Sequence, residues 1–242
     1  MKISTKILLL FFAILLSASS SYAASYIMDL QGSYGNATHS NPNWQNLATA
    51  TSDYGVFWSV NGGSLGHDDL YVGDTVQFLI SMHKNYLGTH YEDLSKTWID
   101  WDQNGTFDSD EVIEYGTHIV KANQTATVTA DSTKTVNEYY TFLSSTYTIT
   151  DAEIGDLFLR SRVTCSESLT GSLGGGWNDQ WKPQYTSQFE NKFNPTGNYG
   201  QGEVEEWDIK VNPKSAPTPE PSTILLFGSG IFGFLGMKRK KK

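Results

Sequence analysis

The sequence predicts an all-β fold, a single antiparallel β-sandwich of the jelly-roll or immunoglobulin-like type, with an N-terminal signal peptide and a C-terminal membrane helix outside it. Short runs of alternating apolar and polar residues recur between residues 24 and 211, separated by clusters of Gly, Asn and Asp. No window of about twelve residues carries the apolar stripe of an amphipathic helix. About seven to nine strands at this spacing are typical of a sandwich.

Residues 1–23 are predicted to be a secretory signal peptide. Lys2 and Lys6 supply positive charge, 7–16 is an unbroken apolar run, and Ser21-Tyr22-Ala23 offers small residues at a cleavage site. The alternative is a membrane anchor, but a span needs about 17–25 apolar residues. We therefore expect an exported protein whose folded domain covers residues 24–211.

The clearest predicted strand is Thr75–Met82, because Val76, Phe78, Ile80 and Met82 fall on one face of an extended chain. Turn sequences such as Asn61-Gly62-Gly63 separate it from its neighbours. Similar alternation predicts strands at Gly55–Val60, Glu111–Val120, Gln124–Thr129, Glu138–Thr148, Leu157–Cys165 and Trp207–Val211.

The segment Asp100–Glu111 fits the pattern of a twelve-residue calcium-binding loop. Acceptor side chains occupy its first, third and fifth positions, glycine its sixth and glutamate its twelfth. The flanks predict strands rather than helices, so we expect a Ca²⁺ loop within a strand connection. The alternative is an acidic turn. The predicted ligands are Asp100, Asp102, Asn104, Thr106, Asp108 and Glu111.

Alternation in the segment Gly202–Val211 places two carboxylates on the face that carries Trp207, Ile209 and Val211. A carboxylate that faces a core needs a partner, because an unpaired buried charge is very costly. Arg160 and Arg162 share a face with Phe158 and are available. We therefore predict buried ion pairs among Glu203, Glu205, Arg160 and Arg162, unless the strand begins only at Trp207 and the glutamates are solvated.

Three segments together, Trp98–Glu111, Leu159–Val163 and Gly202–Trp207, resemble the GEVED domain of secreted bacterial surface proteins. That domain is named after a Gly-Glu-Val-Glu-Asp run. Here Glu206 stands in place of the Asp, and Trp207 follows where a Tyr is usual. The resemblance covers roughly residues 54–211, and it implies a β-sandwich accessory module without an assigned catalytic activity.

The segment 166–202 departs from the strand pattern, being rich in Gly, Asn, Gln and aromatic residues. A loop of this length within a compact domain is uncommon unless it has a function. Exposed rings of Trp177, Trp181 and Tyr185 would stack on sugar rings. The alternative is that the rings of this segment fold back and cover one end of the sandwich.

The tail contains a Pro-rich stalk, residues 212–221, and an apolar helix with a basic end, residues 222–242. Pro219-Glu220-Pro221 followed by this helix and five cations resembles the PEP-CTERM sorting signal of Gram-negative bacteria. The resemblance implies an inner-membrane-tethered precursor that an exosortase-type enzyme processes and delivers to the cell surface or extracellular matrix. A permanent single-pass anchor is the alternative.

Charge and composition exclude several functions. Lys2, Lys6 and the five cations after Pro221 account for 7 of the 17 basic residues, so 10 remain against 26 acidic ones, a net charge of −16. Such a body does not bind nucleic acid, which requires clustered Lys and Arg. The single cysteine, Cys165, excludes a disulfide framework and a cysteine-built zinc site.

The sequence gives little support to catalysis. Gly62–Gly66 matches the G-x-S-x-G pattern of esterases, but a predicted strand follows where that pattern requires a helix. The five histidines do not form an H-E-x-x-H motif. We predict a non-enzymatic protein with an adhesive or structural role in biofilm or exopolysaccharide. A carbohydrate-binding module and a polysaccharide-active enzyme with paired carboxylates remain as alternatives, and release of reducing sugar would distinguish the enzyme.

Overall fold

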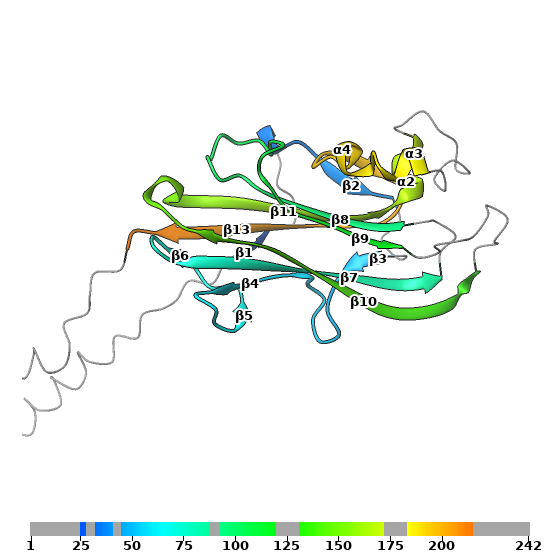
Figure 1. Ribbon diagram of the computed structural model, residues 1–242, viewed down its shortest axis with the longest axis horizontal. Coiled ribbons are helices and arrows are strands. Elements are labelled where there is room, and N and C mark those ends of the chain that lie inside the picture. The colour runs from blue at the N-terminus through cyan, green and yellow to red at the C-terminus, as the bar shows by residue number, and fades with distance from the viewer. Residues whose placement is uncertain are drawn as a thin grey trace, which may run out of the picture.

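The computed structural model describes residues 25–27, 32–40, 45–87, 92–119, 131–171 and 183–214 (Figure 1). The predicted signal peptide, the predicted strand at 124–129, the sorting motif at 219–221 and the C-terminal helix lie outside the described residues. No helix in the described part of the chain is long and apolar enough to cross a membrane.

The all-β prediction is confirmed, and most strands belong to two antiparallel sheets. The first sheet has the order β1-β13-β11-β8-β9, and β6 runs parallel to the end of β13. Its strands are β1 (Ser25–Ile27), β6 (Leu70–Tyr71), β8 (Glu92–Ile99), β9 (Val112–Ile119), β11 (Gly155–Cys165) and β13 (Glu203–Asn212).

The second sheet has the order β10-β7-β4-β5, and β3 pairs with β7. Its strands are β3 (Gln45–Leu47), β4 (Val56–Val60), β5 (Leu65–Gly66), β7 (Thr75–Leu87) and β10 (Asp131–Thr148). The first and second sheets lie one above the other in Figure 1. The predicted strands in β4, β7, β9, β10, β11 and β13 are therefore present, although β7 ends later than predicted and β10 and β13 begin earlier.

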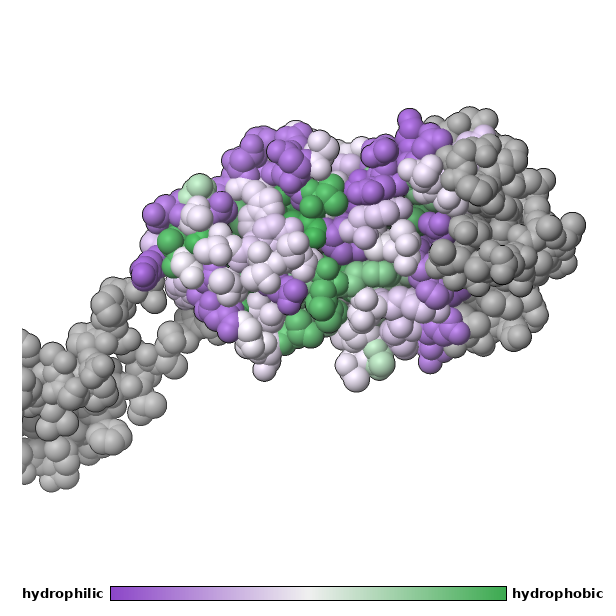
Figure 2. Space-filling model, viewed as in Figure 1, coloured by the Kyte–Doolittle hydropathy of each residue, from purple (hydrophilic) through white to green (hydrophobic). Residues whose placement is uncertain are grey.

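The main hydrophobic core lies between the two sheets. Trp58, Phe78 and Ile80 of the second sheet meet Leu159 and Trp207 of the first, and all five side chains are buried. Alternation along each strand sends these residues inward. On the face drawn in Figure 2, hydrophobic residues appear as separate patches among neutral and polar residues.

A third layer covers the outer face of the first sheet, on the side away from β7 and β10 (Figure 1). It contains the 3₁₀ helix η1 (Gly32–Tyr34), a parallel pair of strands and three short helices. A second 3₁₀ helix, η2 (Asp151–Glu153), precedes β11. The remaining elements are β2 (Ala37–His39), α2 (Ser166–Thr170), α3 (Pro183–Thr186), α4 (Phe189–Lys192) and β12 (Gly197–Tyr199).

This third layer corrects the prediction for residues 166–202, which was a loop without regular structure. The helices α2, α3 and α4 have only four or five residues each, so none produces an apolar stripe in the sequence. Phe189, Phe193 and Tyr199 are buried against Leu94 and Trp98 of β8. These three rings fold back as the alternative supposed, but they cover the outer face of a sheet rather than one end of the sandwich.

The third layer also explains why β8 escaped prediction. All eight residues of β8 are buried, because the second sheet covers one of its faces and the short helices cover the other. A strand that is covered on both faces loses the alternation of apolar and polar residues. The polar side chains of β8 instead find partners inside the protein.

Candidate functional site

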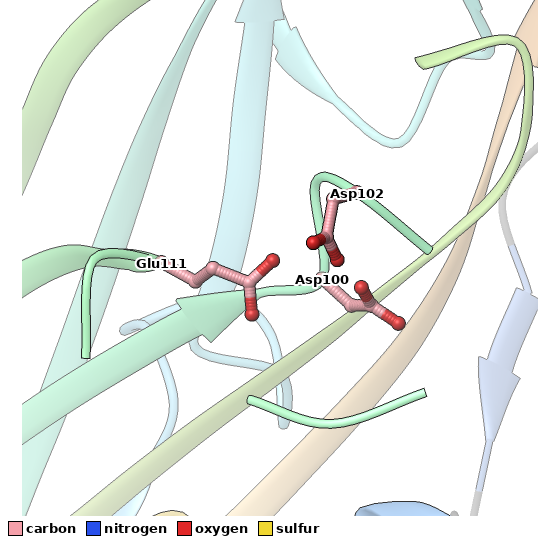
Figure 3. Close-up of side chains that lie close together, drawn as sticks. All are labelled: Asp100, Asp102 and Glu111. Atoms are coloured by element: carbon pink, nitrogen blue, oxygen red, sulfur yellow. The ribbon is translucent and has the colours of Figure 1, made fainter. Parts of the chain in front are cut away.

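The acidic loop, residues 100–111, connects β8 to β9 and lies at the end of the first sheet. Asp100 follows β8 directly, and Glu111 directly precedes β9. Oxygen atoms of Asp100, Asp102 and Glu111 all lie within 4.8 Å of one another. Figure 3 shows the three side chains gathered between the two ends of the loop. The strand ends therefore bring together the first, third and twelfth positions of the predicted ligand set.

Asp100 is fully buried and its carboxylate is held by three donors. The backbone N–H of Asn104 donates to Oδ1 at 3.0 Å, and that of Gly105 donates to Oδ2 at 2.9 Å. The Tyr34 phenol also donates to Oδ2. Burial, together with this hydrogen bond, raises the pKa of Tyr34, so the phenol stays protonated as a donor.

Glu111 closes the loop from the other side. Its Oε1 accepts the Trp101 N–H at 2.8 Å, and its Oε2 accepts the Asp108 N–H at 2.9 Å. Burial is the main cause that raises the pKa of this carboxyl, and the negative charge of Asp100 adds to it. A cation between the two carboxylates would remove that repulsion.

The remaining predicted ligands lie on the exposed side of the loop. The Asn104 amide donates to Asp102 at 3.1 Å and to Asp108 at 3.0 Å. Its carbonyl oxygen accepts from both the N–H and the hydroxyl of Thr106. Asp102, Asn104 and Asp108 thus form one connected group, while Thr106 contacts it through Asn104. The whole donor set is oxygen, which suits a hard cation such as Ca²⁺.

Two residues of the loop have left-handed backbone conformations that make its sharp turn, Gln103 with φ of 57° and Gly105 with φ of 84°. A Cβ atom at Gly105 would lie 2.7 Å from Ser33 Oγ, so glycine is needed for space as well as for conformation. Ser33 and Tyr34 belong to η1, more than sixty residues earlier in the chain. Nothing in the sequence indicated that this segment packs on the loop.

Comparison with protein families matches the loop and the strands around it to a known domain. The model of the GEVED domain matches residues 95–210, and the model of the PEP-CTERM protein-sorting motif matches residues 217–240. The chain carries a GEVED domain. Both resemblances predicted from the sequence are confirmed. No curated protein shows significant similarity to the chain.

The matched part of the GEVED domain begins at β8, later than the residue 54 expected from the sequence. Strands β3, β4 and β7 precede the match, yet they form most of the second sheet and share its core. The PEP-CTERM motif identifies an exported protein that an exosortase-type enzyme sorts to the cell surface.

The Gly-Glu-Val-Glu run of the GEVED domain forms the start of β13, and its two predicted carboxylates face inward as expected. Glu203 accepts the N–H of Leu47 at 2.7 Å. Glu205, which is 1% exposed, accepts the N–H of Gly55 at 2.8 Å and that of Val56 at 3.2 Å. The two glutamates therefore connect the first sheet to the backbone at β3 and at the start of β4.

The predicted ion pairs were wrong in their partners. Arg160 pairs with Glu206, at 2.5 Å between Nη2 and Oε1, rather than with Glu203 or Glu205. Antiparallel pairing sets Arg160 opposite Glu206, and residues paired in this way point to the same face of a sheet. Glu205 is opposite Ser161, on the inner face. The sheet itself therefore separates both arginines from Glu203 and Glu205.

Arg162 binds backbone carbonyls of the third layer instead of a carboxylate. Its guanidinium donates to four of them at 2.9–3.1 Å, those of Thr38, Asn194, Thr196 and Gly197. It also lies 4.3 Å from the centre of the Tyr199 ring. Its Nε donates to His39, and burial followed by the nearby Arg162 charge lowers the pKa of His39 to about 3. Arg162 is thus a structural residue that fastens β2 and β12 to β11.

Burial also dominates the titration of Glu205, whose pKa rises to about 8 although two backbone N–H groups and the Trp207 indole favour its charged form. No lysine or arginine contributes to that shift. Glu205 therefore takes up a proton more readily in the folded protein than in the unfolded chain.

The sugar-binding alternative rested on Trp177, Trp181 and Tyr185. Trp177 and Trp181 lie outside the described residues. Tyr185 is half-buried and packs against the hydrophobic cluster under α4. The structure instead has a cavity of about 260 Å³ beside the acidic loop, lined among others by Trp98, Phe107, Asp108 and Asn194. Asp108 belongs both to this cavity and to the predicted calcium ligands.

Proposed function

We propose that this protein is a non-enzymatic component of the cell surface or extracellular matrix of a Gram-negative bacterium, with a calcium-stabilised GEVED domain. The observation that carries the proposal is the presence of a GEVED domain and a PEP-CTERM motif in one chain. The precursor is tethered to the inner membrane by its tail until the exosortase-type enzyme acts. The mature body then serves an adhesive or structural role in biofilm or exopolysaccharide.

Two features support a role among polysaccharides. The body is strongly acidic, which keeps it soluble and favours cations and neutral polymers over nucleic acid as partners. The cavity beside the acidic loop combines rings, which stack on sugars, with carboxylate and amide groups, which hydrogen bond to hydroxyls. A carbohydrate-binding role at this cavity is therefore the second candidate function.

Replacing Pro219, Glu220 and Pro221 together with alanine is expected to block sorting, because the processing enzyme would no longer recognise the tail. The variant should accumulate in the membrane fraction with its basic C-terminus attached, as a C-terminal epitope or mass spectrometry would detect. Pro213→Ala, in the stalk before the matched motif, is the control and should be released normally. Equal release of all three proteins would argue that this motif does not direct sorting.

Calcium binding is supported by the chemistry of the acidic loop. Between Thr97 and Gly116 the chain has six carboxylates and no Lys or Arg. Asp100 is buried and its three donors are all neutral, so a negative charge stays in the interior next to Glu111. A divalent cation held by Asp100, Asp102 and Glu111 would neutralise this charge, with Asn104, Thr106 and Asp108 completing an oxygen shell.

Calcium is therefore expected to raise the melting temperature. Extracellular modules bind calcium at about 10⁻⁴–10⁻³ M, and ligand at about 100 times its dissociation constant adds about 2.7 kcal/mol to stability. At this chain length that gain corresponds to roughly 5–10 °C. Thermal denaturation in about 10 mM calcium and in chelator measures the difference. Magnesium should do less, because it demands a tighter octahedral shell.

A matched pair of variants localises the effect. Asp102→Asn should remove most of the calcium-dependent increase, whereas Asp110→Asn, an exposed loop residue outside the predicted ligand set, should keep it. Identical melting temperatures with calcium and with chelator for the wild-type protein would make the loop an acidic turn and no more.

A further inference from the structure

A buried ion pair joins the two sheets between β7 and β8. It is separate from the acidic loop and from the inward glutamates of β13. Lys84 of β7 belongs to the second sheet, and Asp93 of β8 belongs to the first. Lys84 Nζ lies 2.6 Å from Asp93 Oδ2, and the two side chains are 2% and 0% exposed. Strand pairing on both sides fixes the position of each residue.

Both side chains of this pair are buried away from water. Removing an ammonium and a carboxylate from water is costly, and a proton transfer between them leaves an amine beside a carboxylic acid. At an ordinary hydrogen-bond angle, the amine nitrogen then lies about 3–3.5 Å from the carboxyl carbon, which is the near-attack range. Rotation of the carboxyl group about its Cβ–Cγ bond presents its face to the nitrogen.

Two neighbouring side chains supply what an amide-forming reaction needs. His118 of β9 is the strand partner of Asp93, and its ring stacks on Tyr140 with centroids 3.5 Å apart. An imidazole ring is a common proton relay. Gln45 of β3 is the strand partner of Lys84, and its fully buried amide has no hydrogen-bond partner at either its nitrogen or its oxygen. An unused N–H on the strand partner of Lys84 is the kind of donor that can stabilise negative charge on a reacting oxygen.

We propose that Lys84 and Asp93 condense to form an intramolecular isopeptide bond between the two sheets. Lys84 Nζ attacks Asp93 Cγ, and the new C–N bond forms as one C–O bond breaks. The proton lost by the nitrogen passes, by way of His118, to the departing oxygen, which leaves as water. One cation and one anion disappear together, so charge is conserved, and no oxidant or reductant is needed.

Such a crosslink suits the chemistry of this chain. Its only cysteine, Cys165, is buried and free, so an intrachain disulfide is not available to an exported protein of this sequence. An amide between β7 and β8 would hold the two sheets together covalently, and it would resist reduction. It would also replace two buried charges with one neutral group.

Peptide mapping of the full-length protein tests the proposal directly. Trypsin cleaves after unmodified Lys84 and Lys96, so an ion pair yields the free peptide Asn85–Lys96. An isopeptide bond blocks cleavage after Lys84. The expected product is a fragment that runs through Lys84 and ends at Lys96, lighter than its sequence mass by about 18 Da, one water. Denaturation before digestion makes the result independent of folding.

Two variants act as controls. Lys84→Arg keeps a cation and a trypsin site but has no amine nucleophile, so it should release the peptide 85–96. Asp93→Asn should still form the crosslink, with loss of ammonia in place of water, and give a product identical to that of the wild type. Recovery of Asn85–Lys96 from the wild-type protein in the same yield as from Lys84→Arg would overturn the proposal and leave an ion pair.

Discussion

Replacing Arg160 with Met is expected to destabilise the protein by about 3–5 kcal/mol, because it leaves the buried carboxylate of Glu206 without its charged partner. Arg160 is fully buried and Glu206 is 4% exposed. The Arg160 guanidinium reaches Glu206 through Nε at 2.6 Å and Nη2 at 2.5 Å. A surface ion pair would contribute about 1 kcal/mol or less, so burial makes the expected effect large.

A double-mutant cycle separates this pair from the other contacts of Arg160, which also donates to the carbonyls of Tyr34, Gly35 and Pro195. Denaturant midpoints of Arg160→Met, Glu206→Gln and the double variant should reveal coupling of about 1–3 kcal/mol. The same cycle on Arg162→Met and Glu205→Gln should be additive, because the sheet lies between those two residues. Strong coupling in the second cycle and none in the first would contradict the strand register.

The alternation of residues along β11 already indicated that Arg160 and Arg162 face away from Glu203 and Glu205. Leu157, Leu159 and Val163 alternate along β11 and are all fully buried in the main core. Arg160 and Arg162 therefore face the opposite side, away from the face that carries Glu205 and Trp207. What the sequence lacked was any sign that this opposite side is covered. Without the third layer, two arginines on an outer face would simply be solvated.

The acidic loop shows the same division between local and distant information. Its carboxylates, its glycine and its flanking strands are consecutive in sequence, so the convergence of Asp100, Asp102 and Glu111 was predictable. The donors that hold Asp100 in the interior were only partly predictable. Tyr34 comes from a segment 66 residues earlier, and a single tyrosine among many offers no pattern that would identify it. Packing between distant segments decides such contacts.

Alternation predicts a strand only where its two faces meet different environments. In the first part of β7, from Val76 to Ile80, fully buried residues alternate with partly exposed ones, whereas β8 is buried throughout. Lys96 of β8 even donates to the carbonyls of Glu190 and Phe193. From the sequence alone, a charged residue in a buried strand is assigned to the surface, because the partners that allow its burial come from distant segments. For this reason the sequence did not predict β8, which lies beside β11 in the middle of the first sheet.

The substitution with the largest expected effect is Gly202→Ala, at the glycine that opens the Gly-Glu-Val-Glu run. A Cβ atom on Gly202 would lie 1.8 Å from the carbonyl oxygen of Val163 and 3.0 Å from His39 Nδ1. Its φ of 107° is also a conformation that side-chain-bearing residues rarely adopt. Strain of about 1–3 kcal/mol adds to the cost of displacing packed strands, about 1–3 kcal/mol or more.

We therefore expect Gly202→Ala to lose about 4 kcal/mol or more of its free energy of unfolding, measured by denaturant titration. Relief of the clash requires β13 to move away from β11 at Val163, and that shift draws the Glu203 carboxylate away from the Leu47 N–H. Gly200→Ala is the matched control, because a Cβ there would meet only Ser168 Oγ at 3.5 Å, and it should cost less than about 1 kcal/mol. Equal stability of the two variants would show that the chain at Gly202 does not approach β11 this closely and that an alanine is tolerated there.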